Sequence, residues 1–497
     1  MSAVWVWRRP PLIVVFLLLI VRSASGQEAQ SPHEHGAEGS LLASREASGT
    51  AWQPDDAPMY GLHRQSGAWE VMFHGNAFAQ LLHEGARGGM TEGGGINWLM
   101  VMAARPAAAG RFGIRGMLSL EPWTIHGCGY PNLLASGETC NGHTIHDRQH
   151  PHDLLMELAA HFDRPLLASS RWQIYGGLAG EPALGPPGFP HRLSAMPNPL
   201  SPIAHHWLDA THVTFGVITS GVYSDRWKAE ASVFNGREPD DKRYDIDLGA
   251  LDSFSARLSL APLPSLALQV SGGRLNDAET NEAPGGPGVD VTRLTASVTY
   301  HRRSNARFWA GTIAWGANLE SGITTHGMTA ESNLTISERH TWFGRAELNG
   351  KSDHDLDLHD LEGVVTVGKV QGGYTRYLQP RHGLTPGVGA TVSAGFVPEA
   401  ARASYGGSVG FGIGIFLTVR PMPHQMPNPA SSASPTAHVM VQTSLDPARL
   451  SCSPAIDPKA AAFMSYAGQT YFFCTAKERD AFLTNPEMSL LMMPPKE

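Results

Sequence analysis

The stretch Ser408-Val-Gly-Phe-Gly-Ile-Gly-Ile-Phe-Leu-Thr-Val419 decides how this chain folds. Every odd-numbered position from 409 to 419 is apolar, whereas most even-numbered positions carry glycine, serine or threonine. Because successive strand residues point to opposite faces, the alternation separates one apolar face from one small, wet face. The stretch is also about as long as a tilted strand must be to cross a bilayer, roughly ten residues. It therefore predicts a transmembrane β-strand, and residues 387–396 repeat the pattern.

Sixteen segments with this alternation lie between residues 69 and 419. They predict a mainly β chain with a 16-stranded antiparallel transmembrane β-barrel over residues 66–420. Connections are mostly long and polar after odd strands and short after even strands, as in bacterial outer-membrane barrels, whose long loops face outside. Five tryptophans near predicted strand ends are expected to form an interfacial girdle: Trp69, Trp172, Trp227, Trp309 and Trp342.

Composition favours one large barrel over several soluble domains. Of 497 residues, 54 are glycine and 16% are charged, and the mean hydropathy is -0.18, so apolar residues are dispersed along the chain. After residue 26 there is no uninterrupted apolar run of about 18 residues, which argues against a membrane-spanning helix. The net charge of -8 gives no basic footprint, so we expect no nucleic-acid partner.

The N-terminal residues have the layout of a secretory signal peptide. Two arginines at positions 8 and 9 precede an apolar run over residues 12–21 and three small residues that end at Gly26. This order predicts residues 1–26 as a signal peptide and an outer-membrane destination for the barrel. Residues 27–65 show no sustained period and are interpreted as a flexible periplasmic lead-in, although His33-Glu-His35 within them is a possible metal chelate.

Histidines are concentrated in the long connection over residues 122–151. Imidazole nitrogen suits copper and zinc, so the sequence predicts a metal site from His126, His143, His146, His150 and His152. The alternative is a disulfide between Cys128 and Cys140 with the histidines merely polar. Both interpretations hold together if only the histidines are ligands.

Two further connections carry polar clusters. Residues 180–209 are too long for a simple connector and are expected to fold inward or to shape the barrel mouth. Within them His205, His206 and Asp209 are interpreted as rim residues rather than ligands. Residues 353–360 are acidic and contain histidine, which is typical of a solvated surface and at most of weak divalent cation capture.

A composition change after Arg420 marks a second domain. Residues 421–437 form a Pro/Ser-rich linker, and residues 438–497 follow as a small α+β module. In that module Ser451-Cys-Ser-Pro-Ala-Ile-Asp-Pro458, Phe463-Met-Ser-Tyr-Ala-Gly-Gln-Thr-Tyr-Phe-Phe-Cys474 and Arg479-Asp-Ala-Phe-Leu-Thr-Asn-Pro486 resemble the YHS domain. The resemblance covers about an eighth of the chain.

The YHS resemblance implies metal handling, copper and heavy-metal transport included. Cys452 and Cys474 occupy the thiol positions of the family, and Glu478 stands where members often carry another cysteine. Two thiolates suit Cu(I), and the carboxylate would extend a zinc-like site. A disulfide between the two cysteines in the oxidising periplasm is the alternative.

Three classes of function remain, of which we favour the first. It is an outer-membrane channel or metal-handling barrel, surrounded by lipid, that passes small ions or solutes and carries the module in the periplasm. Arg115, Arg345 and Glu347 would then set the field of the pore. The second class is a structural or adhesive barrel with a disulfide-closed module. The third is a hydrolase built on His161, Glu157 and an unplaced serine; we predict that the chain is not an enzyme.

Overall fold

The computed structural model describes residues 45–423, apart from residues 86–88, 109, 142, 168, 280–287, 305, 359–360 and 362. Near the C-terminus it describes residues 443–444, 462–466, 469–475 and 478–479. The chain divides into two compact units, one with the described residues up to 423 and the other with the described residues beyond. The predicted signal peptide, the His33-Glu-His35 motif and residues 424–437 of the linker lie outside the described residues.

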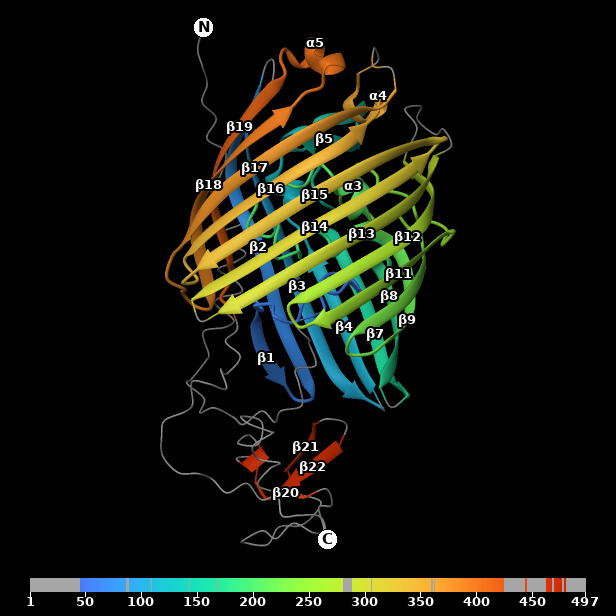
Figure 1. Ribbon diagram of the computed structural model, residues 1–497, viewed down its shortest axis with the longest axis vertical. Coiled ribbons are helices and arrows are strands. Elements are labelled where there is room, and N and C mark those ends of the chain that lie inside the picture. Colours follow the sequence, from blue (N-terminus) through green and yellow to red (C-terminus); the bar gives the residue numbers. More distant parts are fainter. Residues whose placement is uncertain are drawn as a thin grey trace. The chain divides into compact units, whose positions relative to one another are not determined.

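Sixteen antiparallel strands close into a barrel, which confirms the predicted barrel fold (Figure 1). Each strand pairs with its neighbours along the chain, and the last pairs with the first, so the barrel has no open edge. A short extra strand, β1 (Leu62–Ser66), pairs with the beginning of the first barrel strand. The barrel strands are β2 (Trp69–Gly85), β3 (Met90–Ala107), β4 (Gly110–Leu118), β7 (Leu155–Leu167), β8 (Ser170–Gly180), β9 (Thr214–Tyr223), β10 (Trp227–Phe234), β11 (Ser253–Leu263), β12 (Leu266–Glu279), β13 (Val289–Ser304), β14 (Arg307–Glu320), β15 (Ile323–Ile336), β16 (His340–Lys351), β17 (Val365–Tyr377), β18 (Leu384–Phe396) and β19 (Val409–Pro421).

The two faces of the barrel wall follow the predicted alternation. Phe411, Ile413 and Leu417 of β19 are 68%, 58% and 62% exposed on the outside, and large apolar side chains of the other strands are exposed in the same way. Such an outer surface suits a lipid environment. The inner face differs from the prediction of a wet face: a Cβ on Gly410 would meet Leu133 of the long connection after β4, and one on Gly412 would meet the side chains of Glu84 and Ser393 on the neighbouring strands. Side chains therefore occupy the space on the inner side of both glycines.

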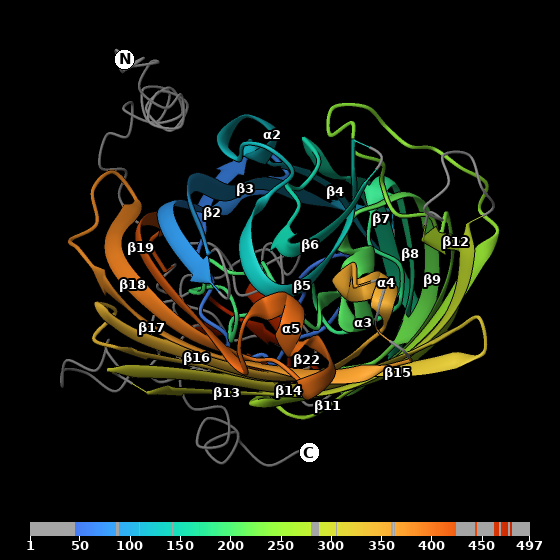
Figure 2. The ribbon, with the colours of Figure 1, turned by 90° about the horizontal axis from the view of Figure 1, so that it is seen from above.

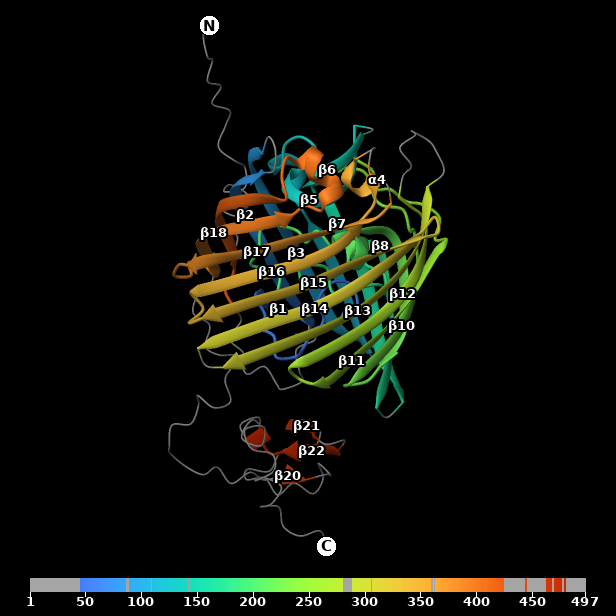
Figure 3. The ribbon, with the colours of Figure 1, turned by 45° about the horizontal axis from the view of Figure 1, so that its top comes forward.

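One rim of the barrel carries the predicted tryptophans. All five lie within the first three residues of β2, β8, β10, β14 and β16, each of which follows a short turn. Three of them, Trp227, Trp309 and Trp342, are 39–45% exposed, and Arg105 and Arg164 stack over the other two. The opposite end holds the long connections, including the hairpin of β5 (Tyr130–Cys140) and β6 (His143–Gln149) (Figure 3). The girdle position and the asymmetry of the loops agree with the prediction.

The helices are short and belong to the long connections. None of the helices in the part of the chain that the structure describes is long and apolar enough to span a membrane. They are α2 (Glu121–Thr124), α3 (His205–Leu208), η1 (Ala210–His212), α4 (Asp353–Leu356), η2 (Glu399–Ala401) and α5 (Arg402–Tyr405).

The connection between β8 and β9 fills the lumen. We call residues 181–213 the inner segment; every residue from 181 to 209 is buried. Seen from above, α3 of this segment lies inside the ring of strands (Figure 2). Wall side chains hydrogen-bond to the inner segment: Arg345 donates to the Leu200 carbonyl at 2.8 Å, and Glu347 accepts from the Ala204 amide at 3.0 Å. The prediction that this connection folds inward is confirmed.

Residues 45–61 also lie inside the barrel. Glu46 accepts from Arg111 and Arg115 of β4 at 2.5 and 2.8 Å, and Lys228 of β10 donates to the Thr50 carbonyl. These buried contacts differ from the predicted flexible lead-in over residues 27–65 at Glu46 and Thr50, whereas Arg64 and Gln65 are exposed. Lumen-facing cations, Arg115 included, bind protein here rather than the water of a pore.

The described residues of the C-terminal unit form a small sheet. It has the order β20 (Thr443–Ser444), β22 (Gln469–Phe473) and β21 (Ala462–Tyr466), with both pairings antiparallel. The hairpin of β21 and β22 overlaps the stretch Phe463–Cys474 that resembles part of the YHS domain.

Candidate metal centre in the barrel lumen

The structure separates the histidines that the sequence grouped together. His126 and His146 are exposed, and His146 lies 3.4 Å from Asp357. His143 begins β6, opposite Cys140. His150 and His152 are buried. Of the four predicted ligands whose side chains the structure describes, two are exposed and two are buried, so these four do not form one site.

Cys128 and Cys140 form a disulfide, the alternative that the sequence left open. This bond joins Cys140, the last residue of β5, to Cys128, which precedes that strand. Its formation leaves the histidines of this connection as the only predicted ligands there. The bond agrees with an oxidising compartment.

His152 meets a histidine of the inner segment. Its Nε2 lies 3.1 Å from Nε2 of His212, and both side chains are buried. Nδ1 of His152 lies 2.9 Å from a carboxylate oxygen of Glu121, which begins α2. Nδ1 of His212 lies 2.8 Å from the backbone carbonyl oxygen of Asp209. We call His152 and His212 the histidine pair.

The two groups that contact the Nδ1 atoms, the Glu121 carboxylate and the Asp209 carbonyl, fix the tautomers of the histidine pair. A carboxylate and a carbonyl oxygen accept hydrogen bonds, so each Nδ1 must carry a proton and donate it. Each neutral ring then presents its Nε2 lone pair to the other ring. Two acceptor nitrogens at 3.1 Å are stable only if they share a cation, either a proton or a metal ion. Carbonyl and carboxylate groups that orient ligating imidazoles are typical of metal sites.

A third imidazole lies beside the histidine pair. The ring centre of His205 is 5.1 Å from that of His212, and its Nδ1 lies 2.8 Å from the Asp209 carboxylate. Phe189 packs against all three rings, with centroid distances of 5.2 to 6.0 Å. The aromatic cover excludes water, which strengthens electrostatic interactions at the pair.

The two rings of the pair differ in basicity. Burial lowers the pKa of His152, but the Glu121 carboxylate outweighs burial and leaves that pKa above its ordinary value. Burial, with the rings of His205 and His152, holds the pKa of His212 well below its ordinary value. A shared proton would therefore reside on His152, and a metal ion would have to displace it.

Asp209 ties the cluster to the barrel wall. Arg192 donates to Asp209 at 2.7 Å and to Glu331 of β15 at 2.7 Å, and Glu331 also accepts from Arg345 at 3.0 Å. Burial raises the pKa of Asp209, but Arg192 and His205 hold that pKa well below its usual range. Asp209 thus stays ionised and keeps His205 in one orientation.

A cavity of about 550 Å³ opens near the histidine cluster. It is lined by His150, two residues before His152, and by Asp241, Arg243 and Asp245 of the connection between β10 and β11. The cavity brings acidic side chains and an imidazole together at the end of the barrel with the long connections. None of His152, His205 and His212 lines the cavity, and Lys242 and Arg243 lie among its acidic residues.

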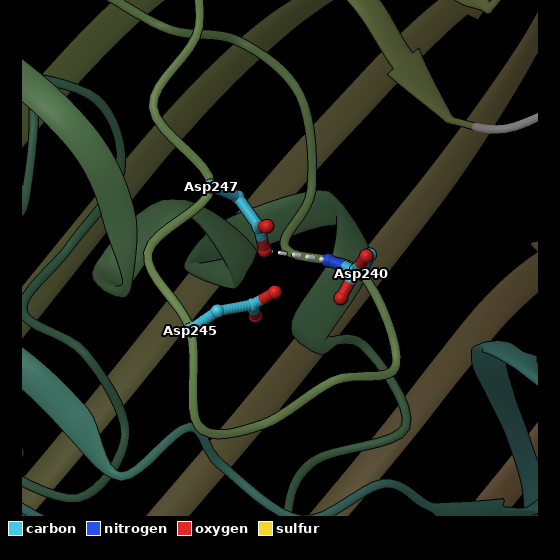
Figure 4. A group of neighbouring side chains, drawn as sticks. All are labelled: Asp240, Asp245 and Asp247. Atoms are coloured by element: carbon cyan, nitrogen blue, oxygen red, sulfur yellow. Dashed lines mark hydrogen bonds between the residues drawn. The ribbon is translucent and has the colours of Figure 1, made fainter.

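Three carboxylates of the same connection also lie together. Oxygens of Asp240, Asp245 and Asp247 lie within 4.8 Å of one another, and the side chains point toward a common centre (Figure 4). One Asp247 oxygen accepts the Asp240 amide, and Lys242 donates to Asp240 at 2.8 Å. Exposed acidic loops commonly adopt such an arrangement, so we assign no site to it.

The predicted site in the C-terminal unit is described only in part. Cys452 lies outside the described residues, and Cys474 is disulfide-bonded, so a thiol at this position requires reduction. The Glu478 carboxylate accepts the Thr475 amide at 3.0 Å. The thiol pair with Glu478 stays a prediction.

The sequence did not identify four members of the lumen cluster as a site. His212 and Glu121, which no motif in the sequence singles out, lie in connections between strands, in η1 and α2. His205 and Asp209 were singled out as rim residues but are buried. One signal in the sequence could have indicated this cluster: the connections over residues 122–151 and 180–209 are both long and rich in histidine, and both are predicted at the same end of the barrel.

No protein-family model matches the chain, and no curated protein matches it. The YHS resemblance therefore stays a prediction. Solved outer-membrane barrels resemble the barrel unit: Salmonella typhi OmpF in complex with daunomycin is 9% identical, covers 72% of this chain and 100% of its own, and has a TM-score of 0.44. An anion-selective porin from Comamonas acidovorans is 10% identical, with coverages of 71% and 99% and a TM-score of 0.41. The channel DcaP of Acinetobacter baumannii is 9% identical, with coverages of 73% and 100% and a TM-score of 0.42. At such scores the fold assignment rests on the strand pairing alone.

Proposed function

We propose that this chain is an outer-membrane β-barrel that binds copper or zinc in its lumen. Ions or small solutes pass through the barrel only when the inner segment leaves its position. The C-terminal module, in the periplasm, binds the same kinds of metal. A freely open pore is disfavoured because the inner segment is buried along its length.

Membrane insertion is supported by the surface of the barrel. The outward side chains of the strands are largely apolar, and the tryptophans gather on the rim with the short turns. Both features are typical of bacterial outer-membrane barrels, in which the short turns face the periplasm. The long connections and the cavity beside His150 would then face the outside.

The histidine pair carries the proposal for metal binding. Two nitrogens that share a tetrahedral metal at bond lengths of about 2.0 to 2.1 Å lie roughly 3.3 Å apart. The Nε2 atoms of His152 and His212 lie 3.1 Å apart, so little movement is needed to admit an ion. His205 or water would complete the coordination, and imidazole ligands suit zinc and copper alike.

Metal analysis of the full-length protein tests the proposal. Protein is purified in detergent, equilibrated with Zn(II), freed of loose metal and analysed by mass spectrometry. The double variant His152→Gln, His212→Gln should retain about one zinc ion fewer than wild type. The matched control is His301→Gln, which changes a buried lumen-facing histidine of β13 whose ring contacts Phe308. Equal zinc content in wild type and the double variant would refute the metal site, as would equal loss in the control.

A further inference from the structure

A second group of soft donor atoms lies inside the barrel. Five of the 17 methionines of the chain pack in one cluster, each at most 5% exposed. They come from four adjacent strands, and all face the lumen. The five are Met72 of β2, Met100 and Met102 of β3, Met117 of β4 and Met156 of β7.

Two of these sulfur atoms contact imidazole nitrogens. Nε2 of His74 lies 3.0 Å from Sδ of Met100, and Nε2 of His191 lies 3.2 Å from Sδ of Met117. These separations fall in the range of N–H···O hydrogen bonds, although sulfur is the larger atom. Methionine often serves only to fill an irregular core. Packing alone does not require that two sulfurs each face a ring nitrogen.

The two contacts belong to one site. The ring of Trp98 lies 5.0 Å from the ring of His74 and 4.3 Å from that of His191, and the two histidine rings are 5.7 Å apart. Both histidines, each with a methionine sulfur at its Nε2, therefore pack against the same indole ring. An aromatic face within about 6 Å stabilises a cation by its quadrupole.

The chemistry of these donors selects a soft ion. Among the described residues, no carboxylate hydrogen-bonds to the ring of His74 or His191. Hard cations such as calcium and magnesium require oxygen ligands, which this group lacks. Thioethers favour Cu(I), and imidazole accepts it as well. Bonds of about 2.0 Å to nitrogen and 2.3 Å to sulfur, meeting at a tetrahedral angle, separate the two ligand atoms by roughly 3.5 Å.

We propose that His74, Met100, Met117 and His191, next to Trp98, form a binding site for a soft monovalent cation, Cu(I). The inference rests on the proposed function in that both place metal in the lumen, but it uses different residues from the histidine pair. His74 and the two methionines belong to the wall, whereas His191 belongs to the inner segment. A bound ion would therefore join the inner segment to the wall.

Silver titration of the full-length protein tests the site. Ag(I) is the probe because it shares the ligand preference of Cu(I) and needs no reductant, so the disulfides stay intact. Binding is followed in detergent by tryptophan fluorescence and by metal analysis in competition with a soluble thioether. The variant Met100→Leu, Met117→Leu removes both sulfurs at nearly constant volume, a change that cores usually tolerate. We expect its Ag(I) affinity to fall at least about tenfold, with zinc content unchanged.

Two controls separate this site from packing and from the histidine pair. Met72→Leu, Met102→Leu changes the same cluster but neither sulfur at a histidine, and should bind Ag(I) as wild type does. His152→Gln, His212→Gln should lose zinc and keep Ag(I). Wild-type Ag(I) affinity in Met100→Leu, Met117→Leu would overturn the inference, and so would equal weakening in the Met72, Met102 control. The two ideas can fail separately. If Met100→Leu, Met117→Leu loses Ag(I) while wild type and His152→Gln, His212→Gln retain the same zinc, the soft site is supported and the zinc site of the proposed function is refuted.

Discussion

Arg192 is the side chain whose removal should release the inner segment. Its guanidinium is 1% exposed and donates to Glu331 at 2.7 and 3.1 Å, to Asp209 at 2.7 Å and to the Pro187 carbonyl at 2.8 Å. The variant Arg192→Met keeps much of the volume and leaves two buried carboxylates without this partner. The seated position of the inner segment should then lose stability.

The magnitude follows from the remaining partners. Removing one member of a buried ion pair costs about 3 to 5 kcal/mol. Glu331 still accepts from Arg345 and Asp209 from His205, so the lower end, about 3 kcal/mol, applies. At 1.4 kcal/mol for each factor of ten, the ratio of open to closed barrels should rise roughly a hundredfold.

Single-channel recording in a planar bilayer measures this ratio. Wild type should open rarely, and Arg192→Met should open far more often to the same current level, since the barrel itself is unchanged. When openings are too infrequent to record, the variant Ala195→Cys measures the same ratio of open to closed barrels. Ala195 is 2% exposed, so a thiol reagent should label this cysteine only when the inner segment has left its position. The control is Arg274→Met, which breaks a solvent-exposed pair with Asp290 that contributes little to stability. A wild type that conducts continuously would refute the seated inner segment, as would identical records for the two variants.

The remaining predictions concern the wall, a buried carboxyl and the C-terminal module. Ile413→Arg should destabilise the assembled barrel by about 2 to 4 kcal/mol because the side chain faces lipid. Gly412→Ser should also impair assembly because its Cβ would meet Glu84, whereas the control Gly116→Ser has open space. Normal heat-modifiability of Ile413→Arg or Gly412→Ser on cold gels would contradict this packing. Burial raises the pKa of Glu181 to about 8, against the lowering effect of Arg257. The folded state therefore favours the protonated carboxyl, and the contribution of this group to stability is complete below its unfolded pKa of 4.5 and is lost as pH rises through about 8. The midpoint temperature of heat modification should decrease between about pH 5 and about pH 9, and it should decrease more in wild type than in Glu181→Gln. An equal decrease of this temperature in the two proteins would exclude the Glu181 carboxyl as the cause. Deleting residues 421–497 should remove Cu(I) bound by the reduced module and leave the zinc of the lumen, whereas unchanged Cu(I) content would leave the module without a metal role.

The wall of the barrel was predictable because its signal is local. Alternation in a stretch such as residues 409–419 places each side chain on a face without reference to the rest of the chain. The order of long and short connections follows in the same way from turn-forming residues. The sixteen strands could therefore be predicted one at a time, and the structure adds where each strand begins and ends.

The contents of the lumen were not predictable because they depend on distant pairs. His152 and His212 are 60 residues apart, and Arg192 and Glu331 are 139 apart, so no spacing in the sequence links them. A buried connection also looks polar in sequence, since its backbone and side chains bond to the polar inner face of the wall. Gly412 illustrates the limit: glycine on a strand face is compatible with water or with close packing, and only the positions of Glu84 and Ser393 on the neighbouring strands distinguish the two.

Metal binding and seating of the inner segment should be coupled, because both metal sites join the segment to other parts of the barrel. The histidine pair links the inner segment at His212 to the preceding connection at His152, and the soft site links it to the wall through His191. A ligand that binds only the seated form stabilises it by about 2.7 kcal/mol at a concentration of 100 Kd. This gain nearly offsets the loss of about 3 kcal/mol expected for Arg192→Met. Zinc at that concentration should therefore close the Arg192→Met barrel again, and it should fail to do so when His152 and His212 are also replaced by glutamine. Equal closure by zinc with and without the histidine pair would show that the metal acts elsewhere, and the coupling would have to be abandoned.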